Sequence, residues 1–230
     1  MRKAILLGFS LALLAATILA LGGLRLGHAA VVDESAAPGA VEAQVVGRLI
    51  VDSTGSAQLI GYYPYISGLP ANLFAGAPSE ATAYFTFRSS TFTLALLQNG
   101  NILHLLSTPS AGATNVMSVY FNSNPNQTFQ TPDTFSNGEL IAQYNTVKFM
   151  GTATPYSGVE AGTLTLVSSH SFSFQGETYD VGPLGSATTI SLTFGQPLSG
   201  GFTLAPAVVA FGGDAIGVGN PNTAIERRSP

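Results

Sequence analysis

The sequence predicts an all-β protein, either an antiparallel β-sandwich or a small β-barrel of about ten strands, after an N-terminal signal peptide. Short segments in which apolar and polar residues alternate follow one another at regular spacing. Turn-forming pairs such as Asn99-Gly100 separate them. After the first 29 residues, no stretch has the apolar periodicity of a helix of three turns. Such a series of short strands is typical of sandwiches and barrels, and the sequence leaves both open.

The first 29 residues have the three parts of a secretory signal peptide. Arg2 and Lys3 precede an uncharged apolar run over residues 4–24, and small residues stand at the −3 and −1 positions of a cleavage site after Ala29. An uncleaved anchor is the alternative, because roughly 20 apolar residues can span a bilayer and Arg25 lies just upstream of the cut. We expect a secreted or cell-surface protein, in contact with a membrane only if this segment is retained.

We predict four regions along the chain. Residues 1–29 are the signal peptide, residues 30–44 a flexible linker, residues 45–211 a single all-β domain and residues 212–230 a tail rich in Gly, Asn and Pro. The linker is small, acidic and aperiodic.

Composition excludes several classes of function. The formal net charge of −4 becomes −7 without residues 1–29, because Arg2, Lys3 and Arg25 leave and 5 basic side chains then face 12 acidic ones. Nucleic acids attract basic surfaces, so we exclude them as partners. Cysteine is absent, which rules out thiol catalysis and thiolate zinc sites.

Within the domain, Asp52 to Gly55 suits a type I turn between the first two strands. Residues 64–79 are rich in Pro and Gly and are compatible with one short helical turn near residues 70–74. Pro206 favours an edge or bulge position for the last strand. Residues 163–167 and 171–174 are either two strands or one long one. The segments predicted as strands are residues 45–51, 57–63, 81–88, 90–98, 101–107, 116–121, 139–150, 163–167, 171–174, 188–194 and 202–211.

The strongest local signal is a hairpin over residues 90–107. A turn at Asn99-Gly100 pairs Leu97 with Ile102 and divides the apolar side chains between two faces. The first face carries Phe92, Leu94, Leu96, Leu103 and Leu105. The second carries Thr93, Ala95, Leu97, Ile102, His104 and Leu106. If Ser89-Ser90 is a turn, the strand of residues 81–88 matches the first face in register, which predicts a three-stranded meander over residues 81–107.

His104 is the one candidate pocket residue. If the second face of the hairpin lines a cavity, His104 is a lone titratable group in an apolar pocket, where it would act as a general base or orient a ligand. The alternative is a core histidine hydrogen-bonded to backbone or to a hydroxyl. The G-x-S-x-G elbow of serine hydrolases is absent. We assign no catalytic residue, no cofactor and no metal ligand, and the sequence favours a non-enzymatic protein without deciding the question.

Other polar clusters have plain structural interpretations. His170, Glu177 and Asp180 surround one turn without fixed ligand geometry. Residues 122–138 form a long loop, and loops of that length are often functional. Its side chains Asn122, Asn124, Asn126 and Asp133 would make at most a weak Ca²⁺ site, since only one is charged.

Two further groups suggest binding surfaces. Arg88 and Glu80 flank the predicted strand 81–88, where they would form an ion pair or the rim of a polar pocket. Four tyrosines near predicted loops offer a platform for a carbohydrate or peptide, although tyrosine at strand ends is ordinary. These are Tyr62, Tyr63, Tyr65 and Tyr120.

Residues 151–166, GTATPYSGVEAGTLTL, resemble the GTG-x-Y-x-G-A-x-G hairpin of allene-oxide-cyclase-like and dirigent-like barrels. Ala153 stands where that family has Gly. The resemblance covers this hairpin alone. It implies a small β-barrel with an apolar ligand and cyclase- or isomerase-like chemistry.

Two functional hypotheses follow. The first is an exported, non-enzymatic β-domain protein that acts as a binding or structural module at the cell surface or outside the cell. The alternative is a small barrel that binds an apolar ligand, with chemistry around His104. The expected partner is a hydrophobic small molecule or a cell-surface component.

Overall fold

The computed structural model describes residues 39–109, 116–154, 157–182, 187–194 and 207–217. The predicted signal peptide lies outside these residues. The elements described within these ranges include two short 3₁₀ helices, η1 (Glu80–Thr82) and η2 (Pro132–Ser136). The strands are β1 (Val41–Val51), β2 (Ser56–Ile66), β3 (Phe85–Ser89), β4 (Phe92–Asn99), β5 (Ile102–Pro109), β6 (Val116–Phe121), β7 (Glu139–Ala153), β8 (Gly158–Ser169), β9 (Phe172–Phe174), β10 (Glu177–Tyr179), β11 (Ala187–Phe194) and β12 (Ala207–Gly217). The predicted all-β fold is confirmed.

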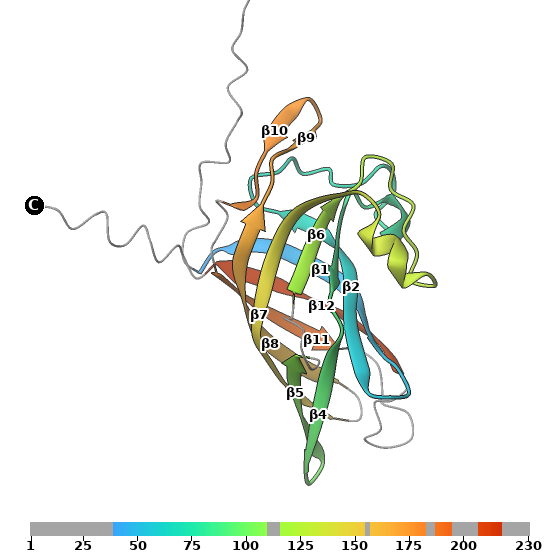
Figure 1. The fold of residues 1–230 in the computed structure, drawn as a ribbon, viewed down its shortest axis with the longest axis vertical. Coiled ribbons are helices and arrows are strands. Elements are labelled where there is room, and N and C mark those ends of the chain that lie inside the picture. Colours follow the sequence, from blue (N-terminus) through green and yellow to red (C-terminus); the bar gives the residue numbers. More distant parts are fainter. Residues whose placement is uncertain (1–38, 110–115, 155–156, 183–186, 195–206, 218–230) are drawn as a thin grey trace, which may run out of the picture.

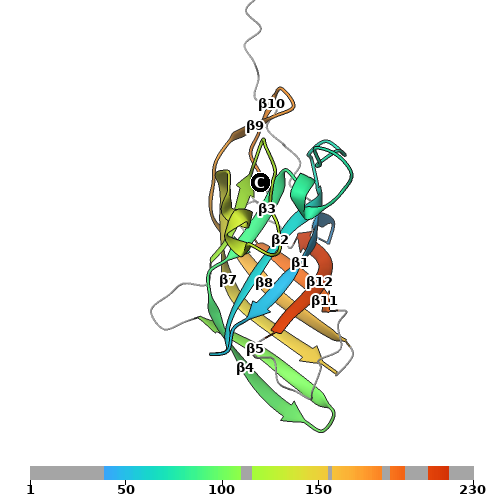
Figure 2. The ribbon, with the colours of Figure 1, turned by 90° about the vertical axis from the view of Figure 1, so that its right-hand side faces the viewer.

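Eight of the described strands pair in a closed ring. The ring runs β1–β12–β11–β8–β7–β6–β3–β2 and returns to β1, with every pair antiparallel. Figures 1 and 2 show these strands inclined around a common interior. Of the two predicted architectures the fold is therefore the barrel, and closure removes the unpaired edges of an open sheet.

The hairpin of β4 and β5 extends the wall at the lower end of Figure 1. β4 pairs with the start of β2, and β5 pairs with the end of β7. Ser90 fastens the junction to β6, because its N–H donates to the Val116 carbonyl at 2.7 Å and its Oγ accepts from the Val116 N–H at 3.0 Å. Between β2 and β7 the wall thus consists of two strand pairs end to end, β3–β6 and β4–β5.

The predicted meander over residues 81–107 is wrong in its first connection. β3 pairs with β2 and β6, not with β4. β2 is antiparallel to both β3 and β4, so these two strands run in the same direction and Ser89-Ser90 continues the chain instead of turning it. The Ser89 hydroxyl accepts a hydrogen bond from the Leu59 N–H at 2.9 Å, which holds the continuation against β2.

The hairpin of residues 90–107 is confirmed, with a register that differs from the prediction. Leu97 pairs with His104, so the turn residues are Gly100 and Asn101, and Gly100 has a φ of 60°. Because the shift is two residues, every side chain keeps its predicted face. Leu103 and Leu105 of the first face are buried in the interior, as predicted.

Two other predicted turns are confirmed. Between β1 and β2, the Gly55 N–H donates to the Asp52 carbonyl at 3.1 Å, and Asp52 Oδ1 accepts from the Thr54 N–H at 2.8 Å. Between β9 and β10, Gln175 and Gly176 have φ values of 52° and 87°, which suit a hairpin turn.

Two strands extend beyond their predicted ends, because backbone pairing continues past the segments in which apolar and polar side chains alternate. β1 begins at Val41, inside the predicted linker, and β12 continues past Phe211 to Gly217, inside the predicted tail. These two extensions pair with each other, for example Val41 with Ile216. β12 starts directly after Pro206, and residues 202–206 of the predicted last strand lie outside the described residues.

Two further predictions concern residues 163–174 and residues 70–74, near the upper end of Figure 1. β8 and β9 are separate strands, because the chain leaves the wall at His170, whose N–H donates to the Ile141 carbonyl at 2.9 Å. No helical turn forms at residues 70–74. Phe74 instead makes an isolated bridge with Ala83. Among the described residues, no helix has the length and apolar character needed to cross a membrane.

The upper part of the interior is filled by aromatic rings. Phe172 and Phe174 of β9 lie within 5.2–5.5 Å, between ring centroids, of Phe85, and both rings also contact Phe121. Burial of four large rings contributes several kcal/mol in order of magnitude. The β9–β10 hairpin thus plugs this end of the barrel.

A pair of glycines lets two further aromatic rings, those of Phe87 and Phe211, approach the wall. Gly47 and Gly61 face each other in register on β1 and β2. A Cβ on Gly47 would lie 2.5 Å from Cζ of Phe211, and a Cβ on Gly61 would lie 2.5 Å from Cζ of Phe87. The rings occupy the space that these side chains would fill.

Candidate functional site

Glu160 is a buried carboxyl on the inner face of the barrel wall. On β8 the buried residues alternate, Gly158, Glu160, Gly162 and Leu164, while Val159 and Ala161 are exposed. Glu160 is paired with Gly151 of β7, which is paired in turn with Leu105 of β5. Glu160 therefore shares the inner face with Leu105 and Leu164, both of which are buried.

The carboxyl of Glu160 lacks the partners that a buried acid ordinarily has. The residue is 2% exposed, and within the described part of the chain no group forms a hydrogen bond with its Oε1. Burial raises the pKa of Glu160 to about 7, since a charged carboxylate is poorly solvated there. At neutral pH this side chain is accordingly a mixture of neutral acid and anion.

The interior around Glu160 is apolar and lies toward the β4–β5 hairpin, at the lower end of Figure 1. Leu103, Leu105 and Ala153 form a small buried cluster, separate from the main aromatic core, and Leu94 of β4 packs against both. Leu96 follows on the same inner face of β4 but is 37% exposed. Leu96 is thus an inward-facing leucine of the β4–β5 hairpin that is partly exposed to solvent.

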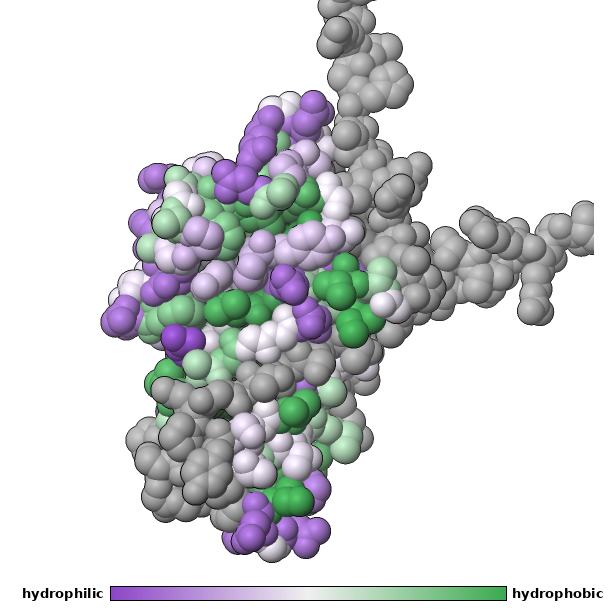
Figure 3. Space-filling model, turned by 180° about the vertical axis from the view of Figure 1, so that it is seen from behind, coloured by the Kyte–Doolittle hydropathy of each residue, from purple (hydrophilic) through white to green (hydrophobic). Residues whose placement is uncertain are grey.

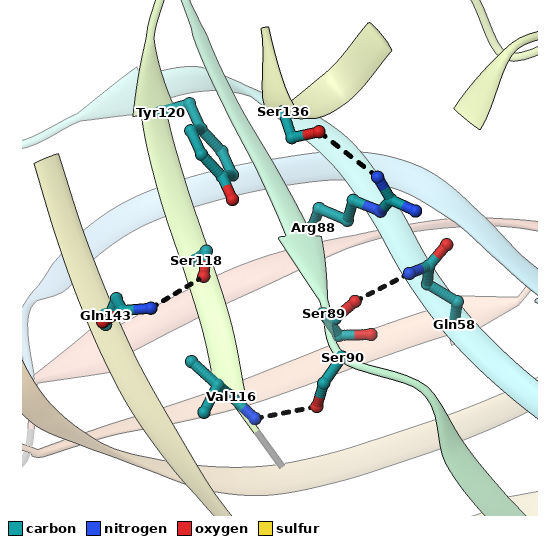
Figure 4. A pocket seen from close by; sticks show the side chains of 9 residues that line it. All are labelled: Gln58, Arg88, Ser89, Ser90, Val116, Ser118, Tyr120, Ser136 and Gln143. Carbon is teal, nitrogen blue, oxygen red and sulfur yellow. Dashed lines mark hydrogen bonds between the residues drawn. The ribbon is translucent and has the colours of Figure 1, made fainter. Parts of the chain in front are cut away.

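A second candidate site is a polar groove on the outer wall, shown in Figure 4. It has a volume of about 350 Å³, within the range of roughly 300–1,000 Å³ for small-molecule pockets. The groove lies where β3 passes into β4 beside the start of β6. Its lining residues are Gln58, Arg88, Ser89, Ser90, Val116, Ser118, Tyr120, Ser136 and Gln143.

Part of the polar lining of the groove is engaged in holding the wall together. The Gln58 Nε2 donates to the Ser89 carbonyl at 2.9 Å, and the Gln143 Nε2 makes a long hydrogen bond of 3.4 Å to the Ser118 Oγ. Figure 4 shows both amides on opposite sides of the groove, with the Tyr120 hydroxyl directed between them.

The long loop of residues 122–138 builds one side of this groove. Arg88 Nη2 lies 2.6 Å from Asp133 Oδ1, and Arg88 Nη1 donates to the Ser136 Oγ at 3.2 Å. The Thr86 hydroxyl donates to the Phe135 carbonyl at 2.8 Å, with both residues fully buried. The Phe129 ring stacks on Phe135 at 4.9 Å. The loop is thus fixed on the outside of the barrel, and Arg88 is a pocket residue whose ion-pair partner is Asp133, not Glu80.

The structure places His104 on the outer face of the barrel. Its neighbours in register are Leu97 on β4 and Thr152 on β7, both exposed. The inner face at this end carries Glu160 instead, so the titratable group in the apolar interior is not the one that the sequence singled out.

The second face of the β4–β5 hairpin contributes to an outer apolar surface. Leu97 is 57% exposed, and the exposed residues Ile102, Met150 and Val159 lie on β5, β7 and β8. Figure 3 shows the opposite side of the molecule from Figure 1, where hydrophobic and polar side chains are interspersed and the tip of the hairpin is hydrophilic.

The other predicted clusters are not brought together as sites. Asp180 Oδ1 accepts from the Gly182 N–H at 2.8 Å, and His170 and Glu177 are exposed. Asn122 Oδ1 accepts from the Asn124 N–H at 3.0 Å. Throughout the described ranges, no three His, Asp or Glu side chains lie close enough to hold a metal ion.

The four tyrosines also separate. Tyr63 packs inside, 5.3 Å from Phe87 between ring centroids. Tyr62 lies outside, 6.4 Å from Phe129, and Tyr65 is exposed. Tyr120 alone lines the groove.

Sequence reasoning missed Glu160, although a signal was present. Residues 158–164 alternate with Gly, Glu, Gly and Leu at every second position, which puts Glu160 on the face of Leu164. A glutamate on the apolar face of a strand is unusual and marks a candidate site.

Comparison with known protein families, with curated proteins and with solved structures finds no match. Residues 151–154 and 157–166, within the segment that resembles allene-oxide-cyclase-like and dirigent-like hairpins, form the end of β7, part of the turn and most of β8. Function is therefore argued from the geometry of the barrel.

Proposed function

We propose that the protein is an exported, non-enzymatic binding protein that holds an apolar small molecule inside its barrel, with the ligand's polar group against Glu160. The observation that carries the proposal is the buried carboxyl of Glu160 without a hydrogen-bond partner at Oε1. Export is proposed from the signal-peptide pattern of residues 1–29.

Burial of a carboxyl without hydrogen bonds is costly. An unsatisfied buried polar group lowers stability by about 1–3 kcal/mol, and more when it is charged. Leucine or glutamine at position 160 would avoid part of this cost. A ligand that supplies the missing hydrogen bond would offset this cost in the bound state, which gives the buried carboxyl a role in binding.

The surroundings favour an apolar ligand. We place the body of the ligand along Leu96, Leu94 and Leu105, which share the inner face of the β4–β5 hairpin. Leu105 and Glu160 lie on either side of Gly151. These contacts are aliphatic, so the ligand's body is expected to be aliphatic as well.

The carboxyl selects the polar group of the ligand. A hydroxyl can bond to Glu160 in either of its protonation states, because it accepts from the neutral acid and donates to the anion, whereas a carbonyl can only accept from the neutral acid. A carboxylate ligand would meet like charge in an apolar interior. The described apolar neighbours Leu103, Leu105 and Ala153 carry no acid, base or nucleophile, and we therefore propose binding without catalysis.

The test compares three probes with the same decyl chain: 1-decanol, decanoate and decylamine. Isothermal titration calorimetry at about pH 8 is expected to show 1-decanol binding at least about tenfold more tightly than decanoate. Glu160→Leu should abolish that preference, while the exposed Glu177→Gln on β10 should leave it unchanged. Native mass spectrometry of the protein purified from its source should show a bound small molecule.

Failure of all three probes to bind would refute a ligand in the interior. Tighter binding of decylamine than of 1-decanol would show that Glu160 pairs with a cation, contrary to the proposed class. A probe ranking unaffected by Glu160→Leu would remove Glu160 from the site.

A further inference from the structure

The outer groove around Arg88 is separated from the interior by the barrel wall. Arg88, Ser118 and Gln143 lie on the outer side of β3, β6 and β7, whereas the alternating residues Phe87, Val119 and Ala142 are buried in the core. A ligand in this groove would not touch Glu160. The groove therefore carries an inference independent of the proposed function.

The groove offers both donors and acceptors to a ligand. The hydrogen bonds drawn in Figure 4 use the amide nitrogens of Gln58 and Gln143, one N–H of Arg88 and the backbone N–H of Val116. The amide oxygens of the two glutamines remain as acceptors, and a guanidinium carries five N–H donors, of which Asp133 and Ser136 take only some. The Tyr120 hydroxyl can both donate and accept a hydrogen bond.

The charge of Arg88 is already paired. Asp133 Oδ1 lies 2.6 Å from its Nη2, although Asp133 is 83% exposed. A phosphate or carboxylate ligand would compete with Asp133 for the same guanidinium and would be repelled by that carboxylate. The remaining lining groups are neutral, namely amides, hydroxyls and one valine. The electrostatics therefore favour a neutral ligand.

Side chains from four elements line the groove, and several of them are already held by hydrogen bonds. Groups that are held in place before binding lose less conformational entropy when a ligand binds. Gln58 comes from β2, Tyr120 from β6, Gln143 from β7 and Ser136 from η2. The fixed loop of residues 122–138 holds Ser136 in place through Arg88 and Thr86. A flat tyrosine ring among these polar groups also offers an apolar surface.

We propose that this groove binds a neutral, hydroxyl-rich molecule, specifically one or two units of a carbohydrate chain. Each hydroxyl of such a ligand both donates and accepts, which matches the mixed lining of Gln58, Gln143 and Arg88. The ring of Tyr120 provides contact for the C–H face of a sugar. The volume of about 350 Å³ suits a small saccharide and is too small for a folded partner.

The test is an NMR titration of the ¹⁵N-labelled protein with four neutral disaccharides, maltose, cellobiose, lactose and chitobiose, and with inorganic phosphate. At least one disaccharide is expected to shift the amide signals of Ser89, Ser90 and Ser118, and phosphate is not. Tyr120→Phe removes one hydroxyl and Gln143→Ala one amide. Each should weaken the disaccharide at least about fivefold.

Tyr65→Phe is the matched control, because Tyr65 is an exposed tyrosine on β2 outside the groove. Glu160→Leu should leave disaccharide binding unchanged, which separates this site from the interior one. No shift with any disaccharide, a stronger response to phosphate, or equal affinity in Tyr120→Phe, Gln143→Ala and the unsubstituted protein would each overturn the proposal.

Discussion

Leu105 and Glu160 lie on either side of Gly151, on the inner face of three neighbouring strands. A Cβ on Gly151 would lie 3.3 Å from Leu105 Cδ1 and 3.3 Å from Glu160 Cβ. The missing side chain at position 151 thus leaves room for the Leu105 methyl group and the Glu160 Cβ to approach this glycine from both sides. Water is excluded there, and the pKa of Glu160 rises to about 7 because the anion is desolvated.

Glu160→Gln should remove a pH dependence of stability. The folded protein holds the Glu160 proton up to about pH 7, whereas the unfolded chain releases it near the ordinary value of 4.5. The associated stability is complete below pH 4.5 and is lost as pH rises to about 7, which amounts to roughly 3 kcal/mol. Urea unfolding at about pH 4 and at about pH 8 measures this pH-dependent part of the free energy of unfolding.

Relative to the unsubstituted protein, the glutamine variant should therefore gain stability at the higher pH and not at the lower one. The exposed Glu177→Gln on β10 is the control, and its effect should be small at both values. An identical difference between Glu160→Gln and the unsubstituted protein at both pH values would contradict a carboxyl whose pKa is raised by burial.

Local patterns predicted the strands and turns well, because they depend on neighbouring residues. Gly100 and Asp52 mark turns by their own conformational preferences, and the alternation around Leu103 assigns its face correctly. The strand neighbours of β3 were missed, because Ser89-Ser90 is compatible with both a turn and a continuation. Pairing of Val41 with Ile216 is a contact between the two ends of the domain, which no local pattern contains.

The candidate site was less predictable for the same reason. Arg88 was correctly expected at a polar pocket or ion pair, but its partner Asp133 lies on a loop far along the chain. His104 was singled out in the sequence because it is the one titratable residue of an apolar hairpin. In the closed barrel, however, it lies on the outer face. The significance of Glu160 depends on Leu105 and Gly151, which only the closed wall brings to it.

Gly47→Ala should destabilise the barrel strongly. The added methyl group would lie 2.3 Å from the Ile60 carbonyl oxygen and 2.5 Å from the Phe211 ring, so backbone and ring must move. Such overpacking costs about 3 kcal/mol or more. Gly212→Ala on β12 is the matched control, since its nearest atom is 3.6 Å away. Equal midpoints of urea unfolding for the two variants would disprove the close approach.

Asp133→Asn should change the charge of the groove more than the stability of the fold. The ion pair with Arg88 is exposed on the Asp133 side, so its loss should cost less than about 1 kcal/mol. The released guanidinium can then bind an anion. In an NMR titration, inorganic phosphate should shift the Arg88 and Ser118 amides of this variant and not those of the unsubstituted protein. A phosphate response of equal size in both would show that Asp133 does not screen Arg88.

Phe135→Ala should release the loop of residues 122–138 from the wall while the barrel remains folded. The Phe135 ring is fully buried outside the main core, stacked on Phe129, and its carbonyl accepts the hydroxyl of Thr86. Truncation of a buried phenylalanine costs about 3–5 kcal/mol, and here that cost falls on a segment held mainly by this residue. Hydrogen exchange should accelerate at residues 122–138 and stay slow at Leu59 and Val119. Acceleration over the whole barrel would mean that the loop and the barrel unfold as one unit.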